Sequence, residues 1–434
     1  MTKPLTFIHA LQWQDIAPAT QAQTKLSLLD LIGVAAGGTS TRLSQIIAAH
    51  ASEEWGGTQP LLFSPHQASA SGAALAGGML IDSLDGHDGF NPAKGHIGCP
   101  LFSAALAIGH ESNVSGAGFL ASITMGYEFG ARASVAQHRT VPDYHTSGSW
   151  GAVTAAAACA KLLKLSSAQT RHALGIAEYH GPRSQMMRCI DHPTMLKDGS
   201  GWGAMTGVSA TKLALRGFTG APAITVENAP EHWKDLGQRW YVHEQYYKPY
   251  PVCRWAQAPI EAALSLLKTH SLTSQQVDKV TVETFHESVR LATSQPKTTE
   301  EAQYSTSFPV AVAIARGDVT PADIADDALN DPEILRLSRA TEMREHEHAN
   351  APFPLKRLAR VTLTLTSGAT HTSDWMEPKW DHTAPPTEAE LREKYHNLAD
   401  PVLGLPRANA IEDALEALDN TPLSILSSLL LAKV

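Results

Sequence analysis

The chain has few cysteines for its 434 residues, and those it has are scattered. Only Cys99, Cys159, Cys189 and Cys253 are present, and no two of them form a C-x-x-C pair. This argues against a disulfide framework and a zinc site, and against an iron–sulfur cluster, which needs closely matched thiolates. Reduced thiols in a cytosol fit the pattern best.

Basic residues are in the minority, with 34 Lys and Arg against 43 Asp and Glu and a formal net charge of -9. We therefore expect no nucleic-acid partner, because a nucleic-acid surface needs a basic excess. Nor does any stretch approach the roughly 18 consecutive apolar residues of a membrane span. Residues 1–7 lead to no sustained apolar stretch, so we expect no signal peptide and a soluble, cytoplasmic protein. An anionic substrate would need a local cationic pocket.

The common cofactor motifs are also missing. Gly199, Gly201 and Gly203 alternate with other residues, but this is not a dinucleotide fingerprint, because no strand precedes it and the spacing is wrong. We find no P-loop, protein-kinase motif set or G-x-S-x-G elbow. The sequence thus offers no binding motif for a nucleotide.

The length predicts two domains, and a composition of 43% hydrophobic and 18% charged residues is globular. Residues 1 to about 265 are mostly helical in pattern, with Ala-rich or periodic apolar segments between Gly-containing loops. The predicted helices are 24–34, 70–80, 101–108, 151–165 and 205–215. Small side chains let helix backbones approach closely, so we expect a compact helical bundle.

The pattern changes at about residue 266. Residues 280–284 and 361–366 alternate apolar and polar side chains, and a turn at Ser367-Gly368 leads to a return strand over 369–375. Helices are predicted over 308–315 and 331–341. A last helical region starts after Thr387, which is placed as its N-cap, with Glu388 and Glu390 in the first turn.

We therefore predict a mainly α fold with a large all-helical domain and a smaller α+β lid domain. The large domain comprises residues 1–265 and 386–434, and the small one comprises residues 266–385.

Three glycine-containing stretches on predicted loops carry acid/base or cationic side chains. They contain Asp85, Asp88 and His96 (residues 84–100), His145 (144–151) and Lys197 (195–203). Taken singly, each has an ordinary interpretation: a turn or capping Asp, a core His, a solvated Lys. Together they are the groups needed to hold a polycarboxylate and move protons on it without a metal or an organic cofactor.

The ordered set of motifs resembles the MmgE/PrpD family, which includes 2-methylcitrate dehydratases, cis-aconitate decarboxylases and iminodisuccinate epimerases. The matching segments cover essentially the whole chain: Leu84-Asp85 with Asp88, Gly95-His96, Tyr144-His145 with Trp150-Gly151, Leu196-Lys197, Lys248-Pro249-Tyr250-Pro251-Val252-Cys253-Arg254, Gln303-Tyr304-Ser305-Thr306-Ser307-Phe308, and residues 386–395.

The resemblance implies that Asp85, His96, His145 and Lys197 line the active site. It also implies a helical domain with an α+β lid, a homodimer, and no metal or cofactor. We place Asp88, Arg254, Gln257 and Phe308 as substrate-binding residues, with Arg254 and Lys197 anchoring carboxylates.

Three departures from the family's pattern bear on the reaction. Phe308 stands where a Tyr is often found, and Gln257 stands where a His is often found. The loop that resembles Asp-Phe-Asp-Asp-Thr reads Asp85-Gly86-His87-Asp88-Gly89. The proton donors of the site therefore differ from those of the best-known members.

The sequence leaves several functions open. The first is a lyase similar to 2-methylcitrate dehydratase, in which His145 takes the proton α to a carboxylate and His96 or Asp85 protonates the leaving hydroxyl. The second is a dicarboxylate epimerase or isomerase with two bases, and a third is a decarboxylase of the cis-aconitate type. A non-catalytic metabolite-binding protein is the alternative from another class.

Overall fold

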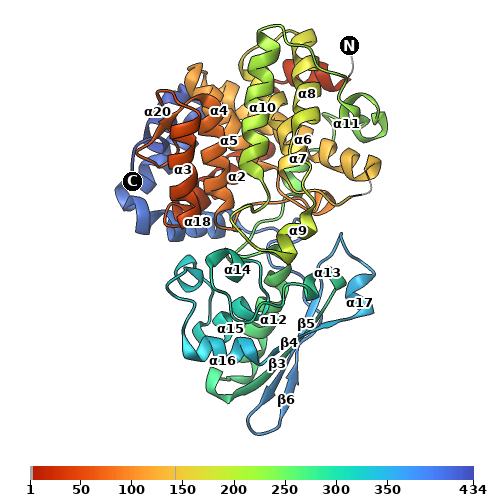
Figure 1. Ribbon diagram of the computed structural model, residues 1–434, viewed down its shortest axis with the longest axis vertical. Coiled ribbons are helices and arrows are strands. Elements are labelled where there is room, and N and C mark those ends of the chain that lie inside the picture. Colours follow the sequence, from red (N-terminus) through yellow and green to blue (C-terminus); the bar gives the residue numbers. More distant parts are fainter. Residues whose placement is uncertain (1–2, 142) are drawn as a thin grey trace.

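The computed structural model describes residues 3–141 and 143–434. Helices form a large body, and a small sheet with its own helices forms a second part, the sheet unit (Figure 1). Helices α9 (Met186–Asp191) and α18 (Glu388–Leu403) lie where the two parts meet. None of the helices in the described residues has the length and apolar character needed to cross a bilayer.

The helical body is built from α1 (Lys3–Ala10), α2 (Pro18–Gly38), α3 (Arg42–Glu54), α4 (Ala70–Asp82), α5 (Gly98–Glu111), α6 (Gly116–Thr140), α7 (Gly148–Leu162), α8 (Ser167–His180), α10 (Ser200–Leu215) and α11 (Ile224–Glu227). A two-stranded ribbon of β1 (Gln59–Pro60) and β2 (Gln67–Ala68) lies between α3 and α4 in the chain. The centre consists of α4, α5, α7 and α10, which pack against one another and are rich in Ala and Gly.

The close approach of α10 to its neighbours depends on two glycines. A Cβ atom at Gly201 would collide with the backbone carbonyl of Leu75 in α4, and one at Gly203 would collide with the carbonyl of Gly148 in α7. The glycine-rich stretch after Lys197 therefore serves helix packing. Through this packing, it places the start of α10 beside the ends of α4 and α7.

The sheet unit has four strands in the order β4-β3-β5-β6. Strand β3 (Val277–Thr284) pairs parallel with β4 (Thr341–Glu345) and antiparallel with β5 (Ala359–Leu365), which pairs antiparallel with β6 (Thr370–Thr372). The remaining helices are α12 (Arg254–His270), α13 (His286–Val289), α14 (Thr299–Gln303), α15 (Ser307–Arg316), α16 (Pro332–Arg339) and α17 (Glu347–Asn350). Helix α12 packs on β5 and α16 on β3, so alternate residues such as Val280 and Val282 are buried.

The C-terminal segment returns to the helical body as α18, α19 (Leu405–Glu416) and α20 (Leu423–Leu430). Helix α18 packs along α2, and Lys394 in α18 forms a buried ion pair with Asp30 in α2. Thr387 caps α18 as the sequence predicts: its hydroxyl accepts from the Glu390 amide, and the Glu390 carboxylate accepts from the Thr387 amide.

The predicted fold class is confirmed: the protein is mainly helical with a small sheet. The predicted helices are present, although α2 begins at Pro18, six residues before the segment that the periodicity predicts. Helices α3, α6, α8, α9 and α12 and strands β1, β2 and β4 were not predicted individually. The residues of β4 are all exposed or half-buried, so they lack the apolar alternation that marks a strand in sequence. The division into two domains at residues 265 and 385 stays a prediction.

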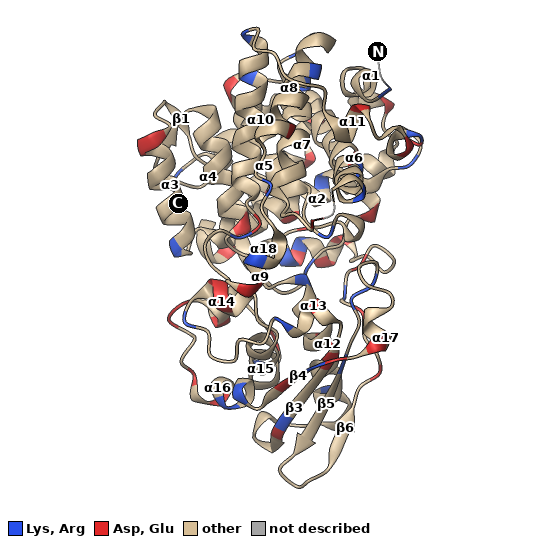
Figure 2. Ribbon diagram, turned by 45° about the vertical axis from the view of Figure 1, so that its right-hand side comes forward, with Lys and Arg blue, Asp and Glu red and all other residues tan. Residues whose placement is uncertain are grey.

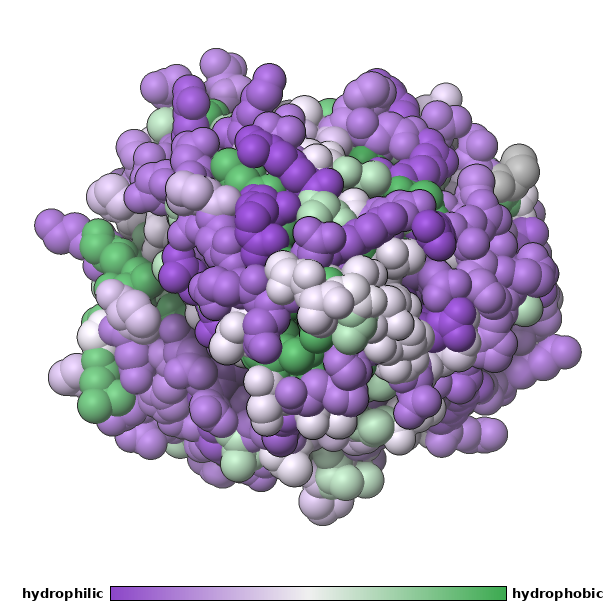
Figure 3. All heavy atoms as spheres, turned by 90° about the horizontal axis from the view of Figure 1, so that it is seen from below, coloured by the Kyte–Doolittle hydropathy of each residue, from purple (hydrophilic) through white to green (hydrophobic). Residues whose placement is uncertain are grey.

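Charged and apolar residues are distributed differently over the molecule. Both positively and negatively charged residues gather where the two parts meet, around α18, α9 and α14 (Figure 2). The end formed by the sheet unit is mostly hydrophilic, with only small hydrophobic groups on the visible face (Figure 3).

The packing role of Gly201 can be tested by Gly201→Ala. Alanine favours helix, but the new methyl group meets backbone atoms of α4 that cannot turn aside, so we expect a loss of stability of about 1–3 kcal/mol. Urea unfolding measures the loss. Gly56→Ala is the matched control, because a Cβ there has nothing within 4 Å; equal midpoints for the two variants would contradict the packing argument.

Candidate active site

The three glycine-containing stretches meet at the side of the helical body that faces the sheet unit, joined by Ser147. The Ser147 hydroxyl accepts a hydrogen bond from the His96 amide (2.9 Å) and donates one to Asp198 Oδ2 (2.7 Å). The Gly148 amide also donates to the Asp198 carbonyl (3.1 Å). Segments 50 residues apart in the sequence thus share one buried polar cluster.

Asp85 is buried and forms an ion pair with Lys248, whose Nζ also donates to the Asp85 carbonyl (2.9 Å). Burial by itself would raise the pKa of Asp85, but Lys248 and then Lys197 outweigh it and hold the pKa well below its usual range. Burial likewise opposes the charge on Lys248, yet Asp85 raises the Lys248 pKa overall. Both groups are charged, so Asp85 is not the proton donor that the sequence offered as one option.

Lys197 is also buried and lies beside the same pair. Its Nζ donates to Gln303 Oε1 (2.6 Å) and stands 4.7 Å from the centre of the Tyr304 ring. Gln303, from α14 of the sheet unit, also accepts from the Asp85 amide (2.9 Å). Lys197 has a left-handed backbone (φ 49°), which is uncommon outside glycine and is often found at functional sites. Gln303 therefore connects both parts of the molecule to this site.

His96 belongs to a chain of three side chains, Asp82, His87 and His96, all buried. The Asp82 carboxylate is 3.0 Å from His87 Nε2 and only accepts, so His87 Nε2 carries the proton and Nδ1 has a lone pair. That lone pair lies 3.0 Å from His96 Nδ1, which also donates to the Asp88 carbonyl. His96 Nδ1 therefore carries the ring's proton, and His96 Nε2 is left with a lone pair.

His96 Nε2 faces two carboxyl groups, at 3.8 Å from Asp85 Oδ1 and 3.8 Å from Asp198 Oδ2. Burial, with a contribution from the charge of Lys248, holds the pKa of His96 well below its usual value, so the ring is neutral at pH 7. Burial and the neighbouring Asp82 and Asp85 raise the pKa of Asp198 to about 7. Within the described residues, Asp198 Oδ1 has no hydrogen-bond partner. A neutral base thus lies beside a weak acid.

Asp88 lies behind His96 and contributes mainly through its backbone. Its carboxyl accepts from the Tyr127 hydroxyl (2.6 Å), and burial raises its pKa to about 7 despite that hydrogen bond. Its carbonyl orients His96. The structure therefore places Asp88 as a support for the imidazole; a contact with substrate stays a prediction.

His145 is buried, and its Nδ1 donates to the Asp143 carbonyl (2.8 Å), which leaves its Nε2 without a hydrogen bond among the described residues. Among the described residues, no hydrogen bond or ion pair joins His145 directly to Asp85, His96 or Lys197. It lies two residues before Ser147, on the same segment of the site, and its catalytic role stays a prediction.

The other three residues placed at the substrate have structural partners. Arg254 pairs with Asp381 (2.7 Å) and stacks over the Tyr246 ring. Gln257 Nε2 donates to two backbone carbonyls (3.0 Å each), and Phe308 is fully buried within the main hydrophobic core. Each side chain thus has partners within the fold, although Arg254 Nε and Gln257 Oε1 have none among the described residues, and contact of the three with substrate stays a prediction.

Sequence reasoning missed Lys248, Gln303, Asp82, His87 and Asp198. The signal for two of them was present, since Lys248 and Gln303 stand in segments that resemble family motifs. For His87, the signal was its replacement of an Asp in the family's pattern. Asp198 stands next to Lys197 in one of the three glycine-containing stretches, which was its signal. Asp82 gave none, because its role arises from contacts between distant segments.

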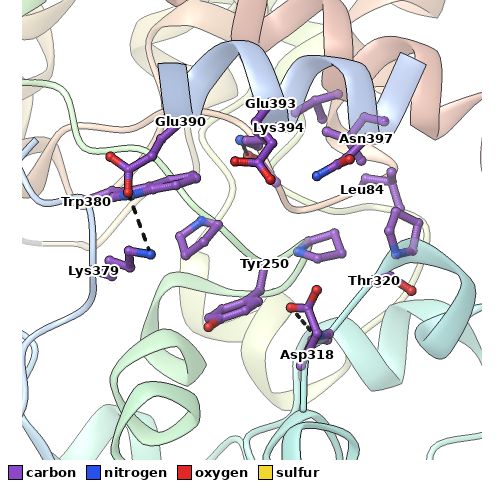
Figure 4. A pocket seen from close by; sticks show the side chains of 17 residues that line it. Leu84, Tyr250, Asp318, Thr320, Lys379, Trp380, Glu390, Glu393, Lys394 and Asn397 are labelled. Atoms are coloured by element: carbon purple, nitrogen blue, oxygen red, sulfur yellow. Dashed lines mark hydrogen bonds and ion pairs between the residues drawn. The ribbon is translucent and has the colours of Figure 1, made fainter. Parts of the chain in front are cut away.

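A cavity of about 480 Å³ reaches the cluster at Lys197 and Thr146, and α9 contributes Arg188 and Cys189 to its wall. We call this the α9 cavity. A second cavity, of about 550 Å³, lies beyond Leu84 and Gly86 and is lined by Tyr250, Trp380 and residues of α18 (Figure 4). Its Lys394 is bonded to Asp30 and to the Gly86 carbonyl. The α9 cavity alone of these two includes a predicted site residue, Lys197.

Within the described residues, two sets of three side chains could offer ligands to a metal ion. The first is Asp85 with His87 and His96, and the second is Asp82 with His87 and Cys99. In the first, Lys248 already neutralises Asp85, and a cation would add a second positive charge. In both, His87 uses its two ring nitrogens for Asp82 and His96. The charge and hydrogen-bond pattern suit proton transfer better than metal binding.

A helical body, an α+β unit and a buried acid/base cluster between them are consistent with the class that the motifs indicate. The chain matches the MmgE/PrpD N-terminal domain over residues 5–230 and the MmgE/PrpD C-terminal domain over residues 250–420. It therefore belongs to the MmgE/PrpD family, which confirms the resemblance.

Several curated proteins are similar to this chain at low identity. A cis-aconitate decarboxylase of Homo sapiens is 24% identical over 459 residues, covering 98% of this chain and 93% of that protein. A cis-aconitate decarboxylase-like protein, oryM, of Aspergillus oryzae is 25% identical over 396 residues, covering 80% of each chain. A cis-aconitate decarboxylase of Aspergillus terreus is 24% identical over 370 residues, covering 76% and 74%.

The buried ion pair can be tested by a double-mutant cycle on Lys248 and Asp85. Lys248→Met leaves Asp85 buried and unpaired, so we expect a loss of stability of about 3–5 kcal/mol. Asp85→Asn in the Lys248→Met background removes the orphaned charge and should restore most of that stability. Urea unfolding of all four proteins measures the coupling; a double variant no more stable than Lys248→Met alone would contradict a direct pair.

Proposed function

We propose that this protein is a cofactor-independent lyase that acts on a tricarboxylate by proton transfer at a carbon α to a carboxylate. The observation that carries the proposal is the neutral His96, with its Nε2 lone pair 3.8 Å from Asp198, whose pKa is about 7. A base and an acid this close, beside two buried lysines, match the needs of an elimination.

The reaction follows from these groups. Lys197, with the Lys248–Asp85 pair beside it, draws a substrate carboxylate into the site. His96 Nε2 takes the proton from the α carbon, and the cations stabilise the enolate-like charge that forms in a site closed to water. Asp198 then gives its proton to the leaving hydroxyl, and water departs. Transfer of a proton from His96 back to Asp198 restores both groups.

This assignment differs from the roles that we predicted from the sequence. There, His145 was the base and His96 or Asp85 the acid; here, His96 is the base and Asp198 the acid. The low pKa of His96 suits a base better than an acid, and the ionised Asp85 has no proton to give. His145 remains the second candidate base, because the bond of its Nδ1 to the Asp143 carbonyl leaves Nε2 available for substrate.

Decarboxylation is the second candidate reaction, favoured by the relatives, which are named as cis-aconitate decarboxylases or as similar to them. In that reaction, Asp198 would protonate a carbon as the neighbouring carboxylate leaves as carbon dioxide. The same site would then work mainly as an acid, and Asp198 would regain its proton from water, because decarboxylation consumes a proton and releases none to His96.

The reactions are separated by incubating chelator-treated protein in D₂O with cis-aconitate, citrate and 2-methylcitrate. Proton NMR and carbon dioxide release follow the products. Loss of water supports the first reaction, and release of carbon dioxide the second. Deuterium entering recovered substrate, with neither loss, would indicate an epimerase. No change in any of the substrates would contradict the proposal.

The choice of base is tested by His96→Gln and His145→Gln. Removal of a general base costs about 10²–10⁴-fold in turnover. We expect His96→Gln to lose activity in this range, while His145→Gln keeps more. Steady-state kinetics under matched conditions measure the difference. A larger loss of activity in His145→Gln than in His96→Gln would make His145 the base.

The raised pKa of Asp198 predicts a pH profile. An acid with a pKa of about 7 holds its proton below pH 7 and loses it above, so kcat/KM should fall as pH rises through about 7. The acidic limb should lie well below pH 6.5, where His96 becomes protonated. In Asp198→Asn, most of the activity should be lost, and the remaining kcat/KM should no longer fall near pH 7. If this variant still shows the same fall of kcat/KM near pH 7, the fall belongs to another group.

A further inference from the structure

The α9 cavity contains no carboxylate of its own, although the protein as a whole is acidic. Its lining residues are Thr146, Pro182, Ser184, Gln185, Arg188, Cys189, His192, Thr194, Leu196, Lys197, Gly199 and Trp202. Two of these, Lys197 and Arg188, are cationic, and His192 adds an imidazole. With a net charge of -9 on the chain, such a cavity is a local positive site that favours an anion.

Helix α9 contributes Arg188 to the lining of this cavity. Met186, Cys189 and Ile190 are buried in a hydrophobic cluster that includes Tyr304 and Trp255 of the segment that leads into the sheet unit. Asp191 at the end of α9 forms an ion pair with Arg290. These contacts fix the helix, so that Arg188 is left on its exposed side.

The charge of Arg188 is not compensated. Within the described part of the chain, its guanidinium makes no hydrogen bond or ion pair, and the nearest acid along the helix, Asp191, is already paired with Arg290. Lys197, which also lines the cavity, is buried. The lining therefore holds two cations, one buried and one exposed, and the cavity's volume of about 480 Å³ falls in the range usual for small-molecule sites.

We propose that Arg188 is a specificity-determining residue that binds a terminal carboxylate of the substrate, while Lys197 holds a carboxylate near the reacting carbon. The planar guanidinium offers two parallel N–H donors, which match a carboxylate. The inference rests on the proposed function, and it adds a preference: substrates with a third, distal carboxylate bind more tightly than those without it.

The test measures binding and does not require turnover. Calorimetry at constant salt compares propane-1,2,3-tricarboxylate with methylsuccinate, which lacks one terminal carboxylate, on wild type, Arg188→Gln and Arg183→Gln. Arg183 is the matched control: it is exposed, five residues earlier, and outside the lining of the cavity.

We expect Arg188→Gln to weaken binding of the tricarboxylate by about 10- to 100-fold, the effect of losing one charged hydrogen-bonding partner. Methylsuccinate should change by less than about threefold, and Arg183→Gln should bind both as wild type does. Arg188→Lys, which keeps the charge but not the paired donors, should recover part of the loss.

The outcomes separate this inference from the proposed function. Unchanged tricarboxylate binding in Arg188→Gln, or an equal loss in Arg183→Gln, overturns the inference, even if wild type is an active lyase. Arg188-dependent binding without turnover of any tricarboxylate supports the inference while overturning the proposed function. Failure of wild type to bind either ligand overturns both.

Discussion

The buried pair of Asp85 and Lys248 is the interaction on which the rest of the site depends. Removing two charges from water costs several kcal/mol per ion, and only close pairing offsets that cost. The pair nevertheless fixes a negative charge 3.8 Å from His96 Nε2 and contributes to the raised pKa of Asp198. Ionisation of one carboxylate thus helps to keep another protonated, as acid/base catalysis at neutral pH requires.

The helical body determines which nitrogen of His96 is free. Asp82, at the end of α4, accepts from His87 and from the Ser200 amide at the start of α10 (3.1 Å). The glycine contact between α4 and α10 brings these two ends together. His87, one of the departures from the family's pattern, donates from Nε2 to Asp82, so its Nδ1 accepts from His96 Nδ1. His96 Nε2 is the nitrogen left free. Packing in the body is therefore coupled to the chemistry of the site.

The sequence predicted several of the main helices and the strands β3, β5 and β6, because Ala-rich periodicity and strand alternation are local signals. It also placed Asp85, His96 and Lys197 in glycine-containing stretches, and the structure brings these stretches together. It could not predict that Lys248 reaches Asp85 or that Gln303 joins Lys197 to Asp85, since both are long-range contacts. The motifs also could not show the partners of Arg254 and Phe308, which lie in the ion pair with Asp381 and in the core; their contact with substrate stays a prediction.

The central claim is that His96 is a neutral base whose Nε2 carries no proton. Nitrogen-15 NMR of the imidazoles in the full-length protein tests it most directly, with the His96 signals assigned by their loss in a variant without this residue. The account predicts, between pH 6 and pH 8, an unprotonated Nε2 and a protonated Nδ1 that do not titrate. An Nε2–H tautomer, or an imidazolium that persists at pH 7, would contradict it.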